Sequence, residues 1–293
     1  MPIRILSGTS HPEFSKEVCR HLGVPLTKVL HMKFKNDNSF CRIEESIRED
    51  DIYIIQTSCP PVNDMLMELL LMVDAAKYAS AQRITVVLPY YPYARSDKKD
   101  QPRVPVSARL VADMLVAAGV NRILTCDLHS PQIGAFFRVP ADHLHASPVV
   151  LDYLKLRNLE NHVVVATDAG GAKWTRFYAK NLDLPLAVLD KRRDDNNDQA
   201  KILSVIGDIV GKHCLILDDE ISTGGSMVEA INALIEQGAK SVVAAAIHPV
   251  FAGNALEKLD NTQLKELIVT NTIPLPSYQP KNIKLTQLSL APL

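Results

Sequence analysis

Short apolar runs recur along the chain, and between them apolar residues fall at the three- and four-residue spacing of a helix. Continuous apolar runs of this kind are typical of strands buried on both faces, as in parallel sheets. The runs are Ile3–Leu6, Asp51–Gln56, Ile84–Leu88, Arg122–Cys126, Val163–Ala166, Leu186–Leu189, Cys214–Leu217 and Val242–Ile247. The helical segments are Pro12–Leu22, Val62–Ala79, Val106–Ala118, Gly170–Leu182 and Met227–Gln237. This alternation predicts an α/β chain with mainly parallel sheets flanked by helices.

The alternation runs through both halves of the 293-residue chain. At about 150 residues per domain, this length predicts two domains, each able to bury its own core. We place the boundary within residues 145–150, so that residues 1–147 and 148–293 form the two domains. Polar side chains follow several predicted strands directly, and open α/β sheets bind ligands at that edge. We therefore expect functional residues at the carboxyl ends of strands in both domains.

Composition narrows the classes of function. The 32 basic and 33 acidic residues are well mixed, which argues against a nucleic-acid or membrane surface. No apolar stretch reaches the roughly 18 residues of a spanning helix, and the N-terminus lacks the pattern of a signal peptide. The five cysteines form no Cys-x-x-Cys pair, which favours reduced, buried thiols. A cytoplasmic protein with local phosphate sites is expected.

The most informative motif is an apolar run that ends in acids and a glycine-rich turn, after which an amphipathic helix begins. Residues 215–226 read Leu-Ile-Leu-Asp-Asp-Glu-Ile-Ser-Thr-Gly-Gly-Ser. Backbone N–H groups at the start of the helix form an anion socket, which the hydroxyls and glycines of residues 222–226 leave open to phosphate oxygens. Asp218 and Asp219 precede the socket, where carboxylates can accept hydrogen bonds from vicinal hydroxyls. The motif predicts a ribose 5-phosphate site, and the alternative is an ordinary strand-to-helix turn.

Two further strand ends carry groups that bind metals. Asp127-Leu128-His129 places an acid and an imidazole after a strand, so His129 is a metal or phosphate ligand, or else a structural histidine. Asp168 precedes a glycine-rich helix start and offers a carboxylate to Mg²⁺, which prefers one or two carboxylates together with water and phosphate oxygens.

Two cationic segments lack apolar periodicity and are predicted to be mobile loops, at residues 93–104 and 191–200. The first carries Arg95, and the second begins with Lys191-Arg192-Arg193 directly after a predicted strand. The second segment suits a lid that closes over transferred phosphates. A solvated patch of surface charge is the alternative for each segment.

In order and spacing, these motifs resemble the ribose-phosphate diphosphokinases, which are also called phosphoribosyl diphosphate (PRPP) synthetases. The resemblance covers nearly the whole chain and includes residues 7–11, 60–64, 93–97, 105–108, 127–129, 272–276 and 289–293. It implies two phosphoribosyltransferase-like domains with twisted, mainly parallel sheets, related by internal duplication. It also implies an enzyme that transfers the β,γ-diphosphoryl group of MgATP to O1 of ribose 5-phosphate, giving PRPP and AMP.

The resemblance further implies a role for each matched residue. The catalytic residues would be Lys191, Arg193 and His129. Ribose 5-phosphate would bind to Asp218, Asp219, Ser222, Thr223, Gly224, Gly225 and Ser226. ATP would bind to Phe34, Asn36, Asn38, Arg95, Ser96 and Asp142, with Asp142 reaching in from a neighbouring subunit. Mg²⁺ would be held by His129 and Asp168, and the shared site implies a homo-oligomer.

The sequence departs from the family at several matched positions. Asn38 replaces an acid and Ser96 replaces a glutamine beside the nucleotide, so the preference for ATP is open. Ser222 replaces an acid in the phosphoribosyl turn, where the expected effect is on turnover. The chain also stops at Leu293, before the helix and tail of longer relatives, so weakened regulation by ADP and a smaller assembly are expected.

Two other functions fit parts of the chain. A PRPP-consuming phosphoribosyltransferase would explain residues 218–226 alone, but it needs only one such domain with a short base-binding hood. A catalytically silent regulatory subunit would fit the replacements at Asn38, Ser96 and Ser222. The presence of Lys191, Arg193 and His129 favours an active synthetase over both alternatives.

Overall fold

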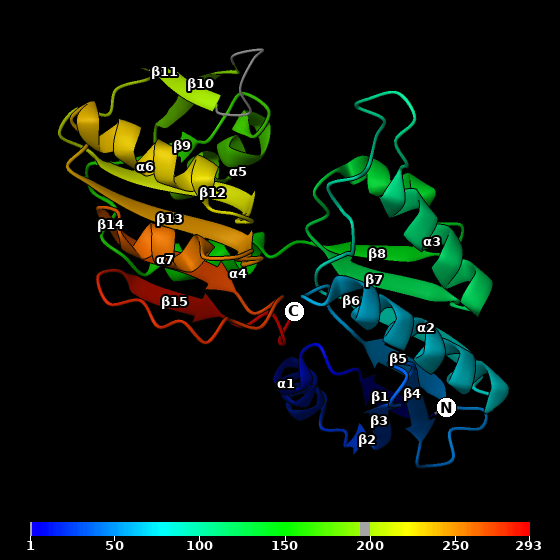
Figure 1. Cartoon of the computed structure of the whole chain (residues 1–293). Coiled ribbons are helices and arrows are strands. Elements are labelled where there is room, and N and C mark those ends of the chain that lie inside the picture. The colour runs from blue at the N-terminus through cyan, green and yellow to red at the C-terminus, as the bar shows by residue number, and fades with distance from the viewer. Residues whose placement is uncertain (1, 194–199) are drawn as a thin grey trace. The chain divides into compact units, whose positions relative to one another are not determined.

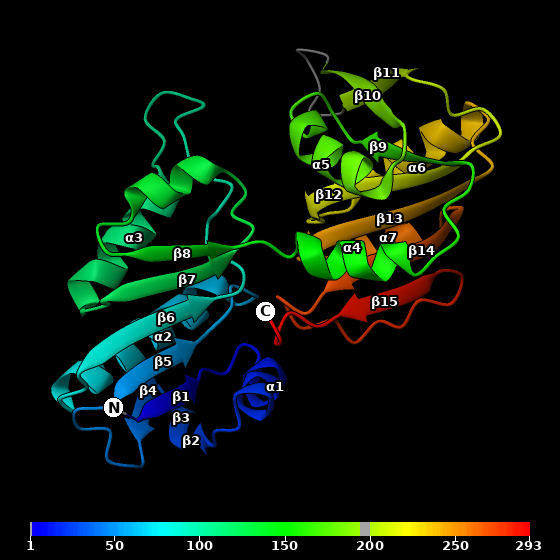
Figure 2. The same cartoon turned by 180° about the vertical axis from the view of Figure 1, so that it is seen from behind.

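The computed structural model describes residues 2–193 and 200–293, with side chains described outside residues 191–203. Contacts divide the chain into two compact units, and each is built on its own sheet (Figures 1 and 2). The first unit comprises Met1–His145, Thr272–Pro274 and Ala291–Leu293, and the second comprises Ala146–Asn271 and Leu275–Leu290. The predicted α/β class is confirmed, and the domain boundary after residue 147 stays a prediction.

The first unit contains a six-stranded sheet in which every neighbouring pair of strands is parallel. Its spatial order is β2 (Leu26–Thr27), β1 (Ile3–Ser7), β5 (Asp51–Ile55), β6 (Arg83–Leu88), β7 (Arg122–Cys126) and β8 (Ala141–Leu144). The helices are α1 (Pro12–Leu22), α2 (Val62–Tyr78), α3 (Ser107–Ala118) and the short 3-10 helix η1 (Pro131–Phe136). A separate antiparallel hairpin, β3 (Val29–Lys33) and β4 (Ser39–Ile43), packs against α2.

The second unit contains a seven-stranded sheet that is parallel except at one edge. Its spatial order is β11 (Ala200–Ile206), β10 (Leu186–Arg193), β9 (His162–Ala166), β12 (His213–Glu220), β13 (Ser241–His248), β14 (Leu264–Thr270) and β15 (Lys284–Leu288). The helices α4 (Ser147–Lys155) and α5 (Ala172–Leu182) lie on one face, and α6 (Gly225–Glu236) and α7 (Ala255–Asp260) lie on the other (Figures 1 and 2).

The two sheets repeat one topology. Strands β2-β1-β5-β6-β7-β8 of the first unit correspond in chain order and in spatial order to β10-β9-β12-β13-β14-β15 of the second. The segment between β5 and α2 therefore corresponds to the segment between β12 and α6. This repetition agrees with the internal duplication that the family resemblance implies.

Each unit buries its own apolar core, because the strands present valine, isoleucine and leucine to helices on the faces of the sheet. In the first unit, Ile52, Ile54 and Val86 are fully buried against α2 residues such as Met72. In the second unit the core includes the inward side chains of β9, β12 and β13 with those of α6. Among the described residues, no helix has the length and apolar character needed to cross a membrane.

The prediction of a loop over residues 191–200 is wrong for residues 191–193, which continue β10, and for Ala200, which begins β11. Residues 194–199 of the predicted loop lie outside the described part of the chain. The backbone of residues 191–193 pairs with β11, Lys191 with Ile202 and Arg193 with Ala200. Pairing between backbone groups needs no apolar periodicity, so the polar sequence gave no sign of the longer strand.

The chain returns to the first unit after β14. Thr57 Oγ1 donates a hydrogen bond of 2.6 Å to the carbonyl oxygen of Thr272 and accepts one of 3.2 Å from the Tyr90 N–H. Thr57 and Thr272 are both buried. A distant stretch of sequence thus completes the hydrogen bonding at the end of β5.

Candidate active site

The turn between β12 and α6 has the geometry of an anion socket. Helix α6 begins at Gly225, after Gly224 at φ 76°. A Cβ added at Gly224 would lie 3.3 Å from the Ala255 carbonyl oxygen, whereas one added at Gly225 would meet nothing within 4 Å. Thr223 and Ser226 are exposed, and Ser222 is half-buried. The first turn of α6 contains no acid, so its N–H groups and the positive end of the helix dipole remain available to a phosphate.

The end of β12 places acids beside this socket. Asp218 Oδ1 accepts a hydrogen bond from the Asp219 N–H at 3.0 Å, and Asp218 Oδ2 accepts one from Thr167 Oγ1 at 3.3 Å. Burial and the neighbouring Asp219 carboxylate raise the pKa of Asp218 to about 8, with a smaller contribution from Asp168. Asp218 therefore binds a proton more readily than an ordinary aspartate, so the pair can offer both a donor and acceptors to a diol.

Asp168 follows β9, the strand next to β12, in the short turn that leads to α5. Its Oδ1 accepts a hydrogen bond of 2.8 Å from the Gly171 N–H, which fixes the carboxylate at the start of the helix. The side chain is exposed. Asp168, Asp218 and Asp219 thus cluster at the carboxyl ends of β9 and β12, where their mutual repulsion favours a cation.

The structure places the backbone of Lys191 and Arg193 in β10, two strands from β12. The side chains of both residues lie outside the part of the chain that the structure describes. Their catalytic roles and the closing of a lid stay predictions.

In the first unit, His129 follows β7 in an exposed position between the buried residues Leu128 and Ser130. Asp127 is buried and has a φ of 33°. Two histidines that the sequence did not indicate contact this turn: His143 of β8 and His145, the residue directly after β8. The His-x-His spacing is the sequence signal that could have indicated them.

Residues 34–38 form the tip of the β3–β4 hairpin, where Asn36 and Asn38 are exposed. The Phe34 N–H donates to the Asn38 carbonyl at 2.9 Å, and the Asn38 N–H donates to Asn36 Oδ1 at 3.3 Å. The ring of Phe34 is 48% exposed and lies 5.7 Å from that of Phe40 in an edge-on arrangement. The exposed ring is available for stacking with a base.

The first turn of α2 ties this hairpin tip to the cationic loop. Lys33 Nζ forms ion pairs with Asp37 at 2.9 Å and Asp64 at 2.7 Å. One residue before Asp64, the Asn63 side chain accepts a hydrogen bond from the Tyr93 hydroxyl. The hairpin tip with Phe34 and the loop that leads to Arg95 are therefore fixed to one helix end.

The remaining two predicted ATP residues have partners within the fold. Ser96 Oγ accepts a hydrogen bond of 3.3 Å from the Ser107 N–H and so closes the loop onto the start of α3. Asp142 accepts bonds of 2.5 and 2.7 Å from Arg122 Nε and Nη2, which lower its pKa. A nucleotide contact by Ser96 and a role of Asp142 across a subunit contact stay predictions.

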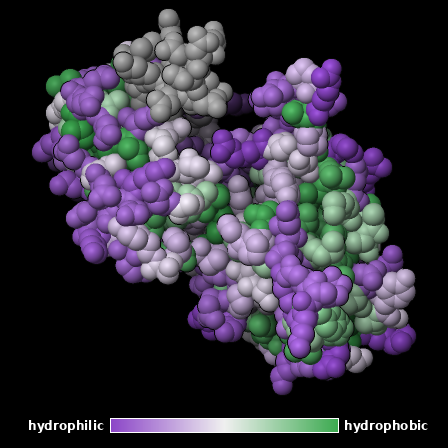
Figure 3. Space-filling view, in the orientation of Figure 1, coloured by the Kyte–Doolittle hydropathy of each residue, from purple (hydrophilic) through white to green (hydrophobic). Residues whose placement is uncertain are grey.

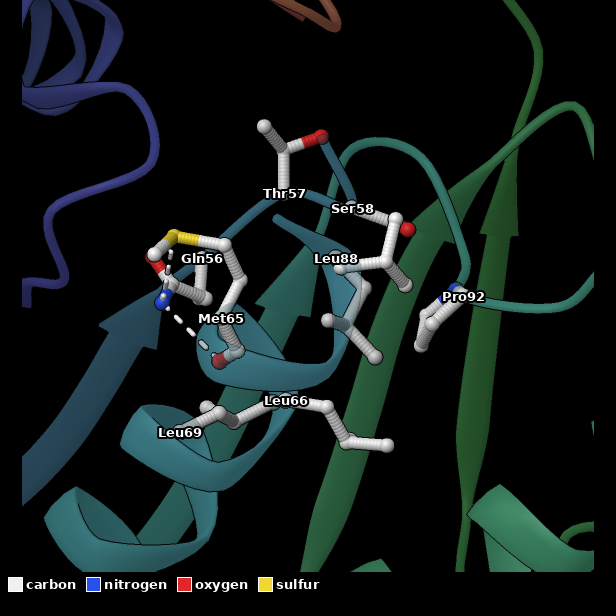
Figure 4. Close-up of a pocket in the computed structure, with 9 residues that line it drawn as sticks. Gln56, Thr57, Ser58, Met65, Leu66, Leu69, Leu88 and Pro92 are labelled. Atoms are coloured by element: carbon white, nitrogen blue, oxygen red, sulfur yellow. Dashed lines mark hydrogen bonds between the residues drawn. The ribbon is translucent and has the colours of Figure 1, made fainter. Parts of the chain in front are cut away.

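A small cavity lies beside the first turns of α2, at the carboxyl end of β5 (Figure 4). Its lining residues are Gln56, Thr57, Ser58, Val62, Met65, Leu66, Leu69, Leu88 and Pro92. Gln56 Nε2 donates to the Met65 carbonyl at 3.0 Å and to Glu68 Oε1 at 2.9 Å. Its amide is thus bonded within the fold, and no predicted site residue lines the cavity, so it is not part of the candidate site.

Comparison with known proteins identifies relatives along nearly the whole chain. Residues 3–119 match the model of the N-terminal domain of ribose phosphate pyrophosphokinase, and residues 151–278 match the phosphoribosyl transferase domain. The ribose-phosphate pyrophosphokinase of Oceanobacillus iheyensis is 45% identical over 99% of this chain and 91% of its own length. That of Helicobacter pylori strain 26695 is 46% identical over 99% and 90%. The crystal structure of phosphoribosylpyrophosphate synthetase from Mycobacterium smegmatis matches with a TM-score of 0.93 and 41% identity, covering 100% of this chain and 96% of that one.

Proposed function

Since this chain belongs to the ribose-phosphate pyrophosphokinase family, we propose that it transfers the β,γ-diphosphoryl group of MgATP to O1 of ribose 5-phosphate. A bond forms between O1 and the β-phosphorus, and the bond from that phosphorus to the α,β-bridging oxygen breaks. AMP leaves with the bridging oxygen, and the O1 proton passes to solvent or to a nearby base. The products are PRPP and AMP.

The observation that carries this proposal is the turn between β12 and α6. An open helix start with no acid in its first turn follows directly on Asp218 and Asp219. Residues 222–226 would bind the 5-phosphate through backbone N–H groups and hydroxyls, and the two carboxyl groups would bind the ring hydroxyls. Both halves of ribose 5-phosphate thus find partners of the right charge and reach.

Asp168, Asp218 and Asp219 fit a Mg²⁺ ion, because they gather carboxylate oxygens, the ligands that this ion prefers, at one edge of the sheet. Burial, and then the charge of Asp219, raise the pKa of Asp218, as expected for acids that lack a cation. We propose that Asp168 and His129 are its protein ligands. Bound there, the ion would neutralise charge on the phosphate oxygens. Asp218, Asp219 and residues 222–226 would hold the ribose in place, with its O1 oriented toward the β-phosphorus.

Lys191 and Arg193 are the proposed catalytic cations. They would stabilise the charge that develops on the β-phosphoryl group and on the leaving oxygen, a role that can contribute roughly 10³–10⁵ in rate in phosphoryl transfer. Their place in the chain supports this role, because β10 lies beside β9, the strand that leads to Asp168.

On the ATP side, we propose that the adenine stacks on the exposed ring of Phe34 and that Arg95 binds the phosphates. The interactions of Lys33 and Tyr93 with α2 support this role, because they fix the hairpin tip and the cationic loop to the same helix end. Ser96 Oγ already accepts the Ser107 N–H, so we expect it to shape the loop rather than to read the base.

We further propose a homo-oligomer and a cytoplasmic location. Met32 on the hairpin, Met67 on α2 and Leu110 on α3 are exposed apolar side chains. Apolar surface is visible over α2 and α3 (Figure 3). Exposed apolar surface of this kind is typical of a contact between proteins. Sedimentation of the purified protein would test the first proposal, and a monomer at all concentrations would contradict it.

The reaction is tested by incubating the purified protein with MgATP and ribose 5-phosphate. Equal amounts of AMP and PRPP are expected, and Lys191→Ala should reduce turnover by about 10³ or more with little change in ribose 5-phosphate affinity. Absence of product with every nucleoside triphosphate would favour the silent regulatory subunit. Consumption of PRPP together with a free base, in place of its formation, would favour the transferase.

A further inference from the structure

The turn after β7 has an unusual backbone. Asp127 adopts a φ of 33°, in a region that residues other than glycine rarely occupy. Such a conformation is unfavourable and persists only where the surroundings impose it. The next residues are the buried Leu128 and the exposed His129. The position of the His129 side chain therefore depends on whatever holds Asp127 and Leu128.

Three hydrogen bonds from β8 and the residue after it hold this turn. The Asp127 N–H donates to the Leu144 carbonyl at 3.0 Å. The Leu128 N–H donates to His143 Nε2 at 2.9 Å, and His145 Nδ1 lies 3.0 Å from Asp127 Oδ1. Asp127 and Leu128 are thus bound by three successive residues, His143, Leu144 and His145, at the end of β8.

The partners fix the tautomers of both imidazoles. His143 Nε2 accepts a backbone N–H, so in the neutral ring the proton is on Nδ1. His145 Nδ1 faces a carboxylate oxygen and is therefore the donor of that bond. The two rings lie 4.5 Å apart and are tilted by 51°, so they also pack against each other.

The same side chains could be mistaken for a metal centre, because ligand atoms of Asp127, His143 and His145 all lie within 4.8 Å of one another. In the observed arrangement His143 has no lone pair to give. Its Nε2 is occupied by the Leu128 N–H, and its Nδ1 carries the proton. A metal ion at this cluster would break the bond that holds Leu128.

We propose that His143 and His145 are positioning residues, a latch that holds the turn of residues 127–129 and so fixes the orientation of His129 for the metal ligation proposed above. The latch rests on the proposed function of His129 and extends it to two residues that do not touch substrate. Metal-ligating histidines depend in the same way on partners that orient them, whose loss typically costs 10–100-fold in activity or metal affinity.

The test compares two substitutions at His143. In His143→Gln the amide oxygen can take the place of Nε2 as acceptor, and in His143→Leu no acceptor remains. We expect His143→Leu to lower kcat by about 10–100-fold and to raise the Mg²⁺ concentration at half-activity, and His143→Gln to stay within about three-fold of the parent. Ribose 5-phosphate affinity, measured by calorimetry, should not change, because its predicted residues belong to the second unit. His145→Asn and His145→Leu form the corresponding pair for the Asp127 contact.

His162→Leu is the matched control, since His162 also belongs to a close histidine pair but lies at the start of β9 in the second unit. Its turnover should equal that of the parent. Nitrogen NMR of the imidazoles should show His143 protonated at Nδ1, a readout that needs no activity.

Three results would overturn the latch. They are parental turnover in His143→Leu, an equal loss of turnover in His143→Gln and His143→Leu at unchanged thermal stability, or stoichiometric Zn²⁺ binding that either histidine substitution abolishes. Failure of the parent to form AMP and PRPP would instead contradict the proposed function, and the NMR tautomer would still report on the latch.

Discussion

After β5 and after β12 the chain reaches the same point of two corresponding sheets, yet it builds two different turns. Strand β12 ends with Asp218, Asp219 and Glu220, and the turn after it ends in two glycines at the start of α6. The turn after β5 begins with Gln56 and ends in Pro60 and Pro61 before α2. The first turn thus offers N–H groups next to acids, and the second contains two residues that have no N–H to donate.

The two helix starts differ in charge as well. Helix α2 has Asp64 in its first turn, so its own carboxylate occupies the favourable end of the helix dipole, whereas α6 has no acid there. Gln56 is bonded to Glu68 and to the Met65 carbonyl, so its polar group is turned inward. The same topology thus places a helix start after the corresponding strand in both units. In the first unit, side chains such as Asp64 occupy that helix start, whereas in the second unit it is left for a ligand.

The largest effect on binding is expected from placing an acid in the first turn of α6, where α2 has Asp64. Ser226→Asp should weaken ribose 5-phosphate binding by about 100-fold or more, because like charges brought together cost several kcal/mol. The same acid should slightly raise thermal stability through the helix dipole. Calorimetry checks the affinity, with Ser226→Asn as the uncharged control. Unchanged affinity in Ser226→Asp would mean that the phosphate does not bind at this helix start.

A second substitution removes the repulsion between the Asp218 and Asp219 carboxylates at the end of β12. The folded-state pKa of Asp218, about 8, exceeds that of an unfolded aspartate, so the residue loses stabilising free energy as pH rises from about 4 through 8. Asp218→Asn should therefore stabilise the ligand-free protein by several kcal/mol at about pH 9, and hardly at all at about pH 4. Denaturant unfolding at both pH values measures the gain. An equal gain at both would show that the cause is not titration of Asp218.

A third change tests the backbone of the turn before α6. Gly224→Ala should destabilise the protein by about 2 kcal/mol, because φ is positive and the new Cβ would lie 3.3 Å from the Ala255 carbonyl oxygen. Gly211→Ala has a similar φ of 68° but meets nothing within 4 Å, so it should cost only about 1 kcal/mol. Thermal unfolding of the two variants measures both losses, and equal losses at Gly224 and Gly211 would remove the close contact as a cause.

The smallest expected effect concerns Asp64, whose carboxylate forms an ion pair with Lys33. Lys33→Met removes its ion pair and should raise the KM for ATP about three-fold, because a half-exposed pair contributes at most about 1 kcal/mol. The KM for ribose 5-phosphate should stay constant. Lys35→Met, which removes a neighbouring exposed lysine, is the control. An equal effect of Lys35→Met would attribute the change to charge alone and not to the contact with α2.

Much of the fold could be predicted from apolar runs, because parallel strands that are buried on both faces consist of almost uninterrupted apolar residues. The predicted strand Arg122–Cys126 coincides with β7, and the prediction over 163–166 misses only the first residue of β9. The β3–β4 hairpin was not predicted, because Met32 and Phe40 are apolar yet exposed. The end of β10 was missed because its partner, β11, satisfies the backbone without apolar side chains.

The candidate site was predictable where a turn follows a strand directly, as at Asp168 and at residues 218–226. Contacts that depend on strand register were not. The alignment of Cys126 with Leu144 brings His143 to the Leu128 N–H, and no local pattern indicates that alignment. The contact of Ser96 with Ser107 likewise depends on how an intervening loop closes.

The hydrogen bond from Thr57 to the Thr272 carbonyl has a consequence for biosynthesis. A ribosome that adds about 5–20 residues per second has made all of β1 to β8 well before it reaches residue 272. During that interval the hydroxyl of Thr57 lacks its acceptor. The hydrogen bonding of the first unit is complete only after residues 272–274, which follow β14 of the second unit, have been made. The first half should consequently be more open to proteases as a nascent chain than in the finished protein, and a fragment of residues 1–145 should keep that vulnerability.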